Sequence, residues 1–264
     1  MAIRLLALDI DGTLTVNSEN EVSARCLEAI RAARDAGVFV TIATGRSNLA
    51  TRPIWETIGL SGPSIQFGGA WIVEAPAGTI IDQQPLSPDV ARDVMRFARE
   101  IHVDAQIYLG DTVVVAQPNP YTARYVARNG MRVLVDPHVY TRLYENVPKI
   151  LAFSEDEERM RTLFEAEFAG RVHITRSQST FIEINERSAT KGHALARLAA
   201  RMGVLQSEVA AMGDSYLDMD MIQWAGTGVC MADSLPEIQR LSDVIAPDCL
   251  HDGVAWFIEN YILV

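Results

Sequence analysis

Residues 5–13 read Leu-Leu-Ala-Leu-Asp-Ile-Asp-Gly-Thr, a short apolar run that ends in two carboxylates. An uninterrupted apolar run of this length is typical of a strand that is buried on both faces of a sheet. Two similar runs, residues 38–43 and 64–67, follow at intervals that leave room for one helix in each gap. This spacing of strands and helices predicts a parallel sheet with helical crossovers.

The alternation of strands and helices is interrupted once. Residues 83–185 read instead as hairpins and helices, a pattern that favours a separate α+β unit. From residue 186 onward the alternation returns and continues to the end of the chain. We therefore predict an α/β protein with a parallel-sheet core formed by residues 1–82 and 186–264, and an inserted α+β domain at residues 83–185.

Two of the predicted helices begin with capping signals. Ser23 precedes a run with apolar residues on one helical face, so we expect its side chain to cap that helix. Ser154 and Glu157 match the spacing of a capping box ahead of a helix in the inserted domain.

Composition and charge exclude several classes of protein. With 34 acidic and 23 basic residues the net charge is −11, which disfavours binding to nucleic acid or to an anionic membrane surface through bulk charge. The three cysteines form no CxxC pair, which fits a reducing cytosol. The sequence has no recognisable signal peptide or spanning segment. We therefore expect a cytoplasmic protein with no nucleic-acid or membrane partner.

Carboxylates follow two strands of the predicted sheet, where open parallel sheets bind their ligands. Asp9 and Asp11 end the first strand, and Asp214 and Asp218 follow a later one. Two unit charges about 4 Å apart repel by about 4 kcal/mol at an effective dielectric constant of 20, so such a cluster needs a cation, a proton or water. Oxygen ligands alone suit Mg²⁺. Asp11 or Asp218 taken alone reads equally well as a turn or cap residue, but the four aspartates together favour a metal site.

Groups that suit an anion lie at the same edge. Thr44-Gly45 follows the second strand and offers a hydroxyl and a backbone N–H, although a plain loop is the alternative. Lys191 is one of only two lysines, with Lys149, among the 23 basic residues. It starts a predicted helix, where the helix dipole disfavours a cation, and a compact ammonium suits a phosphate oxygen. Lys191 is therefore a candidate phosphate ligand, with chance placement as the alternative.

Taken together, these segments resemble the four motifs of the haloacid dehalogenase superfamily. The segments are Asp-Ile-Asp-Gly-Thr-Leu-Thr (9–15), Thr-Gly-Arg (44–46), Lys191 and Gly-Asp-Ser-Tyr-Leu-Asp (213–218). The chain looks like the Cof-type phosphatase branch, because its long insertion separates the second motif from the third. The resemblance implies a Rossmann-like parallel-sheet core with an α+β cap domain, and a phosphoric monoester hydrolase.

The resemblance also implies roles for the four aspartates. Asp9 would attack the phosphorus and form an aspartyl-phosphate, while Asp11 would protonate the leaving oxygen and later activate water. Asp9, Asp214 and the backbone carbonyl of Asp11 would hold Mg²⁺, with Asp218 as a further ligand or as a partner of the ligands.

The remaining motifs imply phosphate binding, with two departures from the family pattern. Thr44, the Gly45 amide and Lys191 would bind the phosphoryl oxygens. Leu217 and Gly68 stand where this branch usually carries asparagine. Each replacement removes a polar group near the metal or the phosphate, so we expect weaker metal binding, a changed water position or a different substrate.

These inferences define a function and its competitors. We expect a Mg²⁺-dependent phosphatase of small phosphorylated metabolites, with sugar phosphates as the expected class. A phosphomutase or phosphotransferase would use the same phosphoenzyme. A non-catalytic phosphate-binding protein is the third possibility, and its support is the pair of departures at Leu217 and Gly68.

Overall fold

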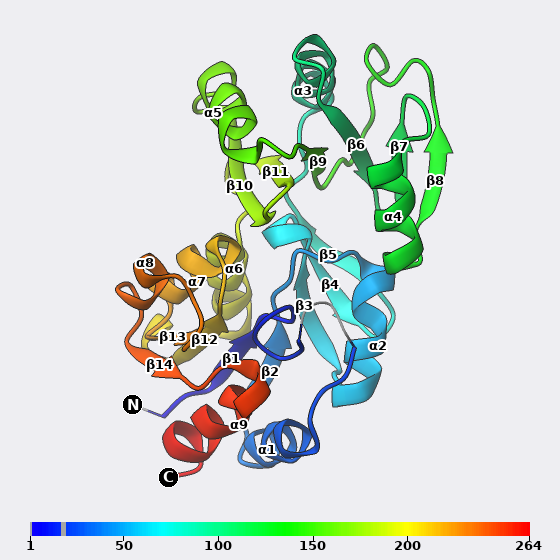
Figure 1. Cartoon of the computed structure of the whole chain (residues 1–264). Helices are drawn as coiled ribbons and strands as arrows, with labels where there is room; N and C mark the ends of the chain where they lie inside the picture. The colour runs from blue at the N-terminus through cyan, green and yellow to red at the C-terminus, as the bar shows by residue number, and fades with distance from the viewer. Residues whose placement is uncertain (1, 17–19) are drawn as a thin grey trace. The chain divides into compact units, whose positions relative to one another are not determined.

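Residues 5–8 form a central strand in the computed structural model of the chain, which describes residues 2–16 and 20–264 (Figure 1). Contacts divide the chain into two units, which we call the core unit and the inserted unit. The core unit is Met1–Gly45, Thr51–Asp82 and Thr190–Val264, and the inserted unit is Arg46–Ala50 and Gln83–Ala189.

The core unit is built on a parallel sheet of five strands. These are β1 (Leu5–Leu8), β2 (Phe39–Ile42), β12 (Val209–Gly213), β13 (Thr227–Met231) and β14 (Val244–Ala246), in the order β14-β13-β12-β1-β2. All four residues of β1 are fully buried, as the unbroken apolar run predicted. The predicted α/β class with a parallel sheet is confirmed.

A smaller sheet extends the core unit. It contains β3 (Gly62–Gln66), β4 (Trp71–Ala75) and β5 (Thr79–Gln83) in that order. A single parallel bridge between Ala43 and Ile65 joins β3 to the end of β2. The backbone at the end of β3 therefore lies beside the segment that follows β2.

Helices supply the apolar cover of the core sheet. They are α1 (Ala24–Asp35), α2 (Asn48–Ile58), α6 (Lys191–Met202), α7 (Met219–Trp224), α8 (Pro236–Gln239) and α9 (Gly253–Phe257), with short 3-10 turns at Phe67–Gly69, Gln206–Glu208, Tyr216–Asp218 and Cys249–His251 and a π-helical turn at Ile258–Ile262. Leu5 and Ala7 share one hydrophobic cluster with Leu195 and Leu198 of α6. Side chains alternate along a strand, so Leu6 and Leu8 point to the opposite face.

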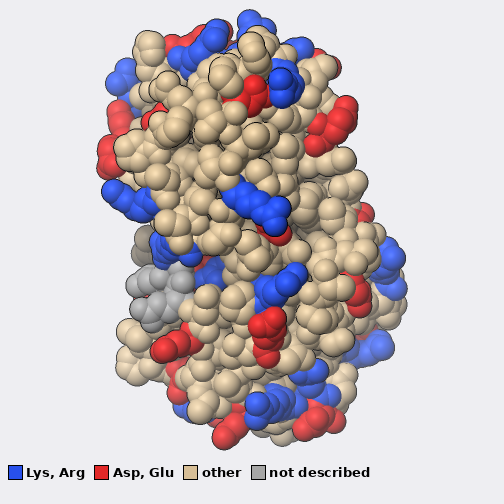
Figure 2. All heavy atoms as spheres, turned by 90° about the vertical axis from the view of Figure 1, so that its right-hand side faces the viewer, with Lys and Arg blue, Asp and Glu red and all other residues tan. Residues whose placement is uncertain are grey.

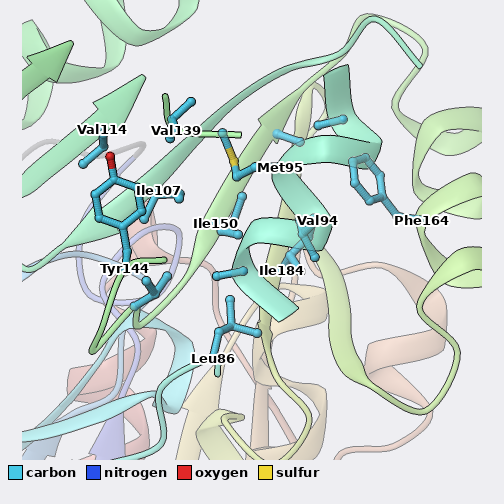
Figure 3. Close-up of a cluster of buried hydrophobic side chains, with 14 of the residues drawn as sticks. Leu86, Val94, Met95, Ile107, Val114, Val139, Tyr144, Ile150, Phe164 and Ile184 are labelled. Carbon is cyan, nitrogen blue, oxygen red and sulfur yellow. The ribbon is translucent and has the colours of Figure 1, made fainter. Parts of the chain in front are cut away.

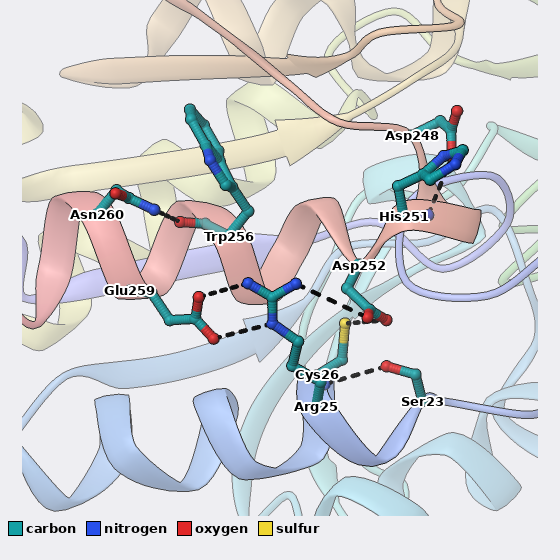
Figure 4. A network of polar contacts seen from close by, with 9 residues as sticks. All are labelled: Ser23, Arg25, Cys26, Asp248, His251, Asp252, Trp256, Glu259 and Asn260. Carbon is teal, nitrogen blue, oxygen red and sulfur yellow. Dashed lines mark hydrogen bonds and ion pairs between the residues drawn. The ribbon is translucent and has the colours of Figure 1, made fainter.

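The helices α1 and α9 lie side by side, and ion pairs join α1 to the N-cap residue of α9 and to the π-helical turn that follows α9 (Figure 4). Arg25 binds Glu259 at 2.6 Å and lies 4.0 Å from a carboxylate oxygen of Asp252. At the start of α1, the Ser23 side chain accepts a hydrogen bond from the Cys26 amide, so the predicted cap is confirmed. The first and last helices of the chain thereby pack together in the core unit.

The inserted unit has a mixed sheet of six strands. They are β6 (Asp104–Leu109), β7 (Thr112–Val115), β8 (Arg132–Val135), β9 (Ile150–Phe153), β10 (Val172–Gln178) and β11 (Phe181–Glu186), in the order β10-β11-β9-β6-β7-β8. All pairs are antiparallel except β7–β8, whose parallel pairing requires a crossover. The helix α4 (Pro120–Asn129) provides that crossover.

The core of the inserted unit lies between this sheet and two helices, α3 (Pro88–Glu100) and α5 (Glu157–Glu167) (Figure 3). Val94 and Met95 of α3 and Phe164 of α5 meet strand residues such as Ile107 and Ile184 in one buried cluster. These side chains make the inserted unit an α+β structure with its own hydrophobic core.

The predicted capping box at α5 is wrong. Asp156 occupies the N-cap position and its side chain makes no capping bond. The Ser154 hydroxyl instead accepts a hydrogen bond from the Asp156 amide at 3.0 Å. Ser154 thus stabilises the turn before the helix, a local bond that competes with true capping.

On the face drawn in Figure 2, basic and acidic side chains are mixed among uncharged ones. Both lysines are buried, so the basic groups exposed there are arginines. Within residues 2–16 and 20–264, no helix combines the length and apolar character needed to cross a membrane.

Candidate active site

The register of the core sheet brings the ends of three strands together. The last residue of β1 is level with Met212 of β12 and Ile42 of β2. Asp9, Asp214 and Thr44 follow closely after these positions, so all three lie at the carboxyl edge of the sheet. This is the edge at which the sequence predicted a ligand site.

Three carboxylates and one ammonium converge there. Single carboxylate oxygens of Asp9, Asp214 and Asp218 all lie within 4.8 Å of one another. The Lys191 ammonium, from the first residue of α6, donates to Oδ1 of Asp9 and to Oδ1 of Asp218, each at 2.5 Å. Lys191 and Asp218 are fully buried and Asp9 nearly so. The lysine therefore partly compensates a cluster of buried negative charge.

Asp218 has a different environment from the other two carboxylates. Its Oδ2 accepts from the Ser215 hydroxyl at 2.7 Å, from the Ser215 amide at 2.9 Å and from the Asp214 amide at 3.2 Å. Because both of its oxygens already accept hydrogen bonds, Asp218 suits a role in holding the loop 213–218 and the ammonium of Lys191 in place.

Two residues that directly follow Asp11 contact the side chain of Asp214, and the sequence analysis assigned them no role. The Thr13 hydroxyl donates to Oδ1 of Asp214 at 3.1 Å. Gly12 has φ +90°, and a Cβ at that position would lie 2.4 Å from Oδ2 of Asp214. Only glycine meets both conditions without strain. The signal was present in the Asp-Gly-Thr sequence, but the contact with Asp214 depends on the sheet order.

Backbone hydrogen bonds join the loop after β2 to the end of β3 and the turn that follows it. The Thr44 amide donates to the Ile65 carbonyl, and the Thr44 carbonyl accepts from the Gly68 amide, both at 3.0 Å. A Cβ at Gly45 would lie 3.5 Å from the Leu217 side chain. Leu217 therefore gives the Thr44-Gly45 loop an apolar neighbour, and Gly68 contributes to that loop through its amide.

Burial sets the protonation behaviour of the cluster. Burial, followed by the charge of Asp218, raises the pKa of Asp9 to about 7. Burial, together with Asp218 and Asp9, raises the pKa of Asp214 to about 9. For Lys191, burial acts to lower the pKa, but Asp218 and Asp9 outweigh it and the pKa is raised. In the absence of a further cation, protons therefore compensate part of the negative charge.

Asp11 lies outside the three-carboxylate cluster. It is partly exposed, and its backbone forms a bridge with Thr15. Its charge still reaches the site, because it contributes to the raised pKa of Asp9. All seven residues predicted from sequence thus belong to the core unit, and three of the four aspartates form the tight cluster.

This site and fold match a known family. A family model described as haloacid dehalogenase-like hydrolase matches residues 6–258, which is nearly the whole chain. The chain belongs to this family, and the resemblance seen in its four motifs is confirmed. Its relatives are named phosphatases, and the chain is an enzyme of that class.

Several curated relatives are named by their substrates, and two of them serve as examples. The chain is 30% identical over 261 residues to the 5-amino-6-(5-phospho-D-ribitylamino)uracil phosphatase YcsE of Bacillus subtilis, covering 99% of this chain and 96% of the relative. It is 24% identical over 284 residues to the pyridoxal phosphate phosphatase YbhA of Escherichia coli, covering both chains completely.

Solved structures show the same fold. A haloacid dehalogenase-like hydrolase from Bacteroides thetaiotaomicron superimposes with a TM-score of 0.83 at 26% identity, covering 97% of this chain and 98% of that one. A haloacid dehalogenase-like hydrolase from B. subtilis gives a TM-score of 0.86 at 24% identity, covering 98% and 99%. Phosphatases of this family generally use a divalent metal, and the buried acidic cluster is compatible with one.

Proposed function

We propose that this protein is a Mg²⁺-dependent phosphatase that hydrolyses small phosphorylated metabolites through an aspartyl-phosphate on Asp9. The observation that carries the proposal is the convergence of Asp9, Asp214 and Asp218 within 4.8 Å, with the Lys191 ammonium on two of them. Such an arrangement concentrates metal ligands and a phosphate ligand at one largely buried point. Sugar phosphates and related polyol phosphates are the proposed substrate class.

The donor set fits Mg²⁺. It consists of oxygen atoms only, and the raised pKa values of Asp9 and Asp214 mean that a cation in place of protons would relieve the repulsion between them. Asp9, Asp214 and the backbone carbonyl of Asp11 would hold the ion. When bound, Mg²⁺ neutralises the carboxylates and offsets the charge of the incoming phosphate.

Asp9 and Asp11 have different roles in the proposed reaction. A carboxylate oxygen of Asp9 forms a bond to phosphorus while the bond from phosphorus to the leaving oxygen breaks, and Asp11 in its acid form gives its proton to that oxygen. Asp11, now a carboxylate, takes a proton from water as that water attacks phosphorus. The bond between phosphorus and the Asp9 oxygen breaks in this second step, which releases inorganic phosphate and restores the Asp9 carboxylate.

We assign phosphate binding to one ammonium group, one hydroxyl group and one backbone amide. Lys191, the Thr44 hydroxyl and the Gly45 amide are proposed to bind the phosphoryl oxygens and to orient them for attack by Asp9. Positioning and electrostatic stabilisation are the main requirements of phosphoryl transfer. Asp218 keeps Lys191 in place through its 2.5 Å contact with the ammonium.

The test is a phosphate-release screen with and without Mg²⁺. The panel contains sugar phosphates, polyol phosphates, pyridoxal 5′-phosphate and a ribitylaminouracil phosphate. We expect Mg²⁺-dependent turnover of at least one member, and its loss in Asp9→Asn. Asp35→Asn, an exposed aspartate at the end of α1, is the matched control and should keep full activity.

Specific results would overturn the proposal. No phosphate release from any panel member, or full activity in Asp9→Asn, contradicts it. Conversion of a sugar phosphate to its isomer without free phosphate would instead identify a mutase. Phosphate binding without turnover, measured by calorimetry, would identify a non-catalytic binding protein.

A further inference from the structure

Asp220 holds the start of the helix that carries Lys191. It lies in the first turn of α7, and its Oδ2 accepts a hydrogen bond from the Gly192 amide at 2.8 Å. Gly192 is the second residue of α6, directly after Lys191. The two helices lie side by side in the core unit (Figure 1). This bond therefore connects the element that follows Asp218 to the element that begins with Lys191.

The bond acts on the peptide group next to Lys191. The Gly192 N–H belongs to the same planar unit as the Lys191 carbonyl, so fixing that N–H fixes the plane on the carboxyl side of the Lys191 Cα. The direction of the Lys191 side chain depends on that plane. Its ammonium reaches Asp9 and Asp218 at 2.5 Å at the end of a stem of four methylene groups. A small rotation at the helix start would displace the ammonium at the end of that stem.

Close backbone approach makes this contact specific. A Cβ at Gly192 would lie 2.7 Å from the carbonyl carbon and oxygen of Asp220 and 2.8 Å from its Oδ2. Glycine at this position thus allows the two helices to meet at their backbones. The first α6 amides lack acceptors within the helix; the Thr190 hydroxyl caps the His193 amide, and Asp220 satisfies that of Gly192.

The carboxylate of Asp220 lies near the N-terminus of α6, where a negative charge interacts favourably with the helix dipole. A lysine at a helix N-terminus is disfavoured by the helix dipole, whereas a carboxylate near the same end is favoured. Asp220 supplies that carboxylate from a neighbouring helix. It can therefore offset the unfavourable placement of Lys191 as well as orient it.

We propose that Asp220 is a positioning residue that sets the place of the Lys191 ammonium in the active site. The proposal rests on the proposed function in so far as Lys191 binds the transferred phosphoryl group. Asp220 itself need not touch substrate. It acts through the Gly192 peptide.

The chain offers a matched control for this bond. Oδ2 of Asp243 accepts from the Gly228 amide, also at 2.8 Å, where Gly228 lies in β13 and Asp243 just before β14. Asp243→Ala removes the same type of bond elsewhere in the core unit. A purely structural role predicts that Asp220→Ala and Asp243→Ala lower the melting temperature without changing the kinetics of the folded enzyme.

The kinetic experiment compares Asp220→Ala, Asp220→Asn and Asp243→Ala on the best substrate of the screen. We expect kcat/KM to fall by about 10- to 100-fold in Asp220→Ala, because displaced phosphate ligands act on the transition state. The inhibition constant of inorganic phosphate should rise in parallel. Asp220→Asn retains an acceptor oxygen and should restore most of the activity, and Asp243→Ala should leave kcat/KM unchanged.

A spectroscopic readout makes the result independent of turnover. Because the chain has only two lysines, protein made with ¹³Cε-labelled lysine gives two side-chain signals, and Lys149→Arg identifies the one from Lys191. Asp220→Ala should shift or broaden the Lys191 signal, and Asp243→Ala should not. An unchanged Lys191 signal, or equal changes in both variants, overturns the proposal. If the wild type releases no phosphate, the proposed function fails while this measurement still decides the role of Asp220.

Discussion

Lys191 shows how one buried residue joins the predicted chemistry to the stability of the fold. Its side chain is 1% exposed, and its ammonium forms ion pairs with both Asp9 and Asp218. A buried ion pair contributes little net stability against a well-packed apolar pair, but removal of one partner leaves a buried charge uncompensated. The same lysine is therefore expected to matter to the free energy of unfolding and to catalysis.

We predict that Lys191→Met lowers the free energy of unfolding by about 3–5 kcal/mol at pH 8 without divalent cations. Urea unfolding followed by circular dichroism measures the change. Arg31→Met, at an exposed position of α1, is the control and should stay within about 0.5 kcal/mol of wild type. A loss below about 1 kcal/mol in Lys191→Met would show that the carboxylates take up protons at little cost.

At the scale of elements, the inserted unit contains a second buried ion pair. Lys149 lies just before β9, and its ammonium binds Glu183 of β11 at 2.8 Å, with both side chains almost fully buried. The ammonium also lies 4.8 Å from the centre of the Tyr108 ring. Burial acts to lower the pKa of Lys149, but Glu183 outweighs it and the pKa is raised. Both lysines of the chain are thus buried and ion-paired.

A double-mutant cycle tests how this pair joins the strands β9 and β11. Lys149→Met alone should cost about 3–5 kcal/mol, because it leaves Glu183 buried without its cation. Lys149→Met combined with Glu183→Leu should cost less than the sum of the single changes, since an apolar pair replaces both charges. Urea unfolding of the full chain gives all three values. Additive losses would mean that the two side chains are not energetically coupled.

Local signals predicted some elements better than others. The Ser23 cap was predictable because its bond joins residues three apart and depends on no distant contact. Ser154 carried a similar pattern, but its hydroxyl bonds the Asp156 amide and the helix begins later. A serine can satisfy several nearby amides, so spacing alone does not decide which one it bonds.

For the molecule as a whole, the acidic site should couple stability to pH and to divalent cations. The folded pKa values of Asp9 and Asp214, about 7 and about 9, lie above the ordinary value of 3.8. The native state therefore binds more protons than the unfolded state between about pH 4 and pH 9. Under the linkage relation, the titration of these two groups lowers the stability of the metal-free protein as pH rises through that range.

In the proposed site Mg²⁺ binds the deprotonated carboxylates, and it should therefore reverse this trend. We predict that the gain in melting temperature on adding Mg²⁺ increases from pH 5.5 to pH 8.5. At a concentration 100 times its dissociation constant, the ion adds about 2.7 kcal/mol. Thermal unfolding with Mg²⁺ or with a chelator measures the gain. A gain that is independent of pH would separate metal binding from the titration of Asp9 and Asp214.

The sequence by itself determined the α/β class, the family and the residues at the ends of the strands. Apolar runs and the polar residues between them are patterns of neighbouring residues. Such patterns indicate strands and helices directly, because each element has its own periodicity of side chains. The identity of Asp9, Thr44 and Asp214 as strand-end residues needed no knowledge of what lies beside them. The phosphatase class followed from the four motifs in their order along the chain.

Only the tertiary structure decided which of these groups meet. Lys191 reaches Asp9 across 182 positions of sequence, and Gly12 accommodates Asp214 because β12 lies beside β1. The bond from Lys191 to Asp218 and the bond from Gly192 to Asp220 likewise depend on the packing of α6 against α7 and the turn before it. Sheet order and helix packing set these distances, and neither is encoded in the spacing of residues along one strand or helix.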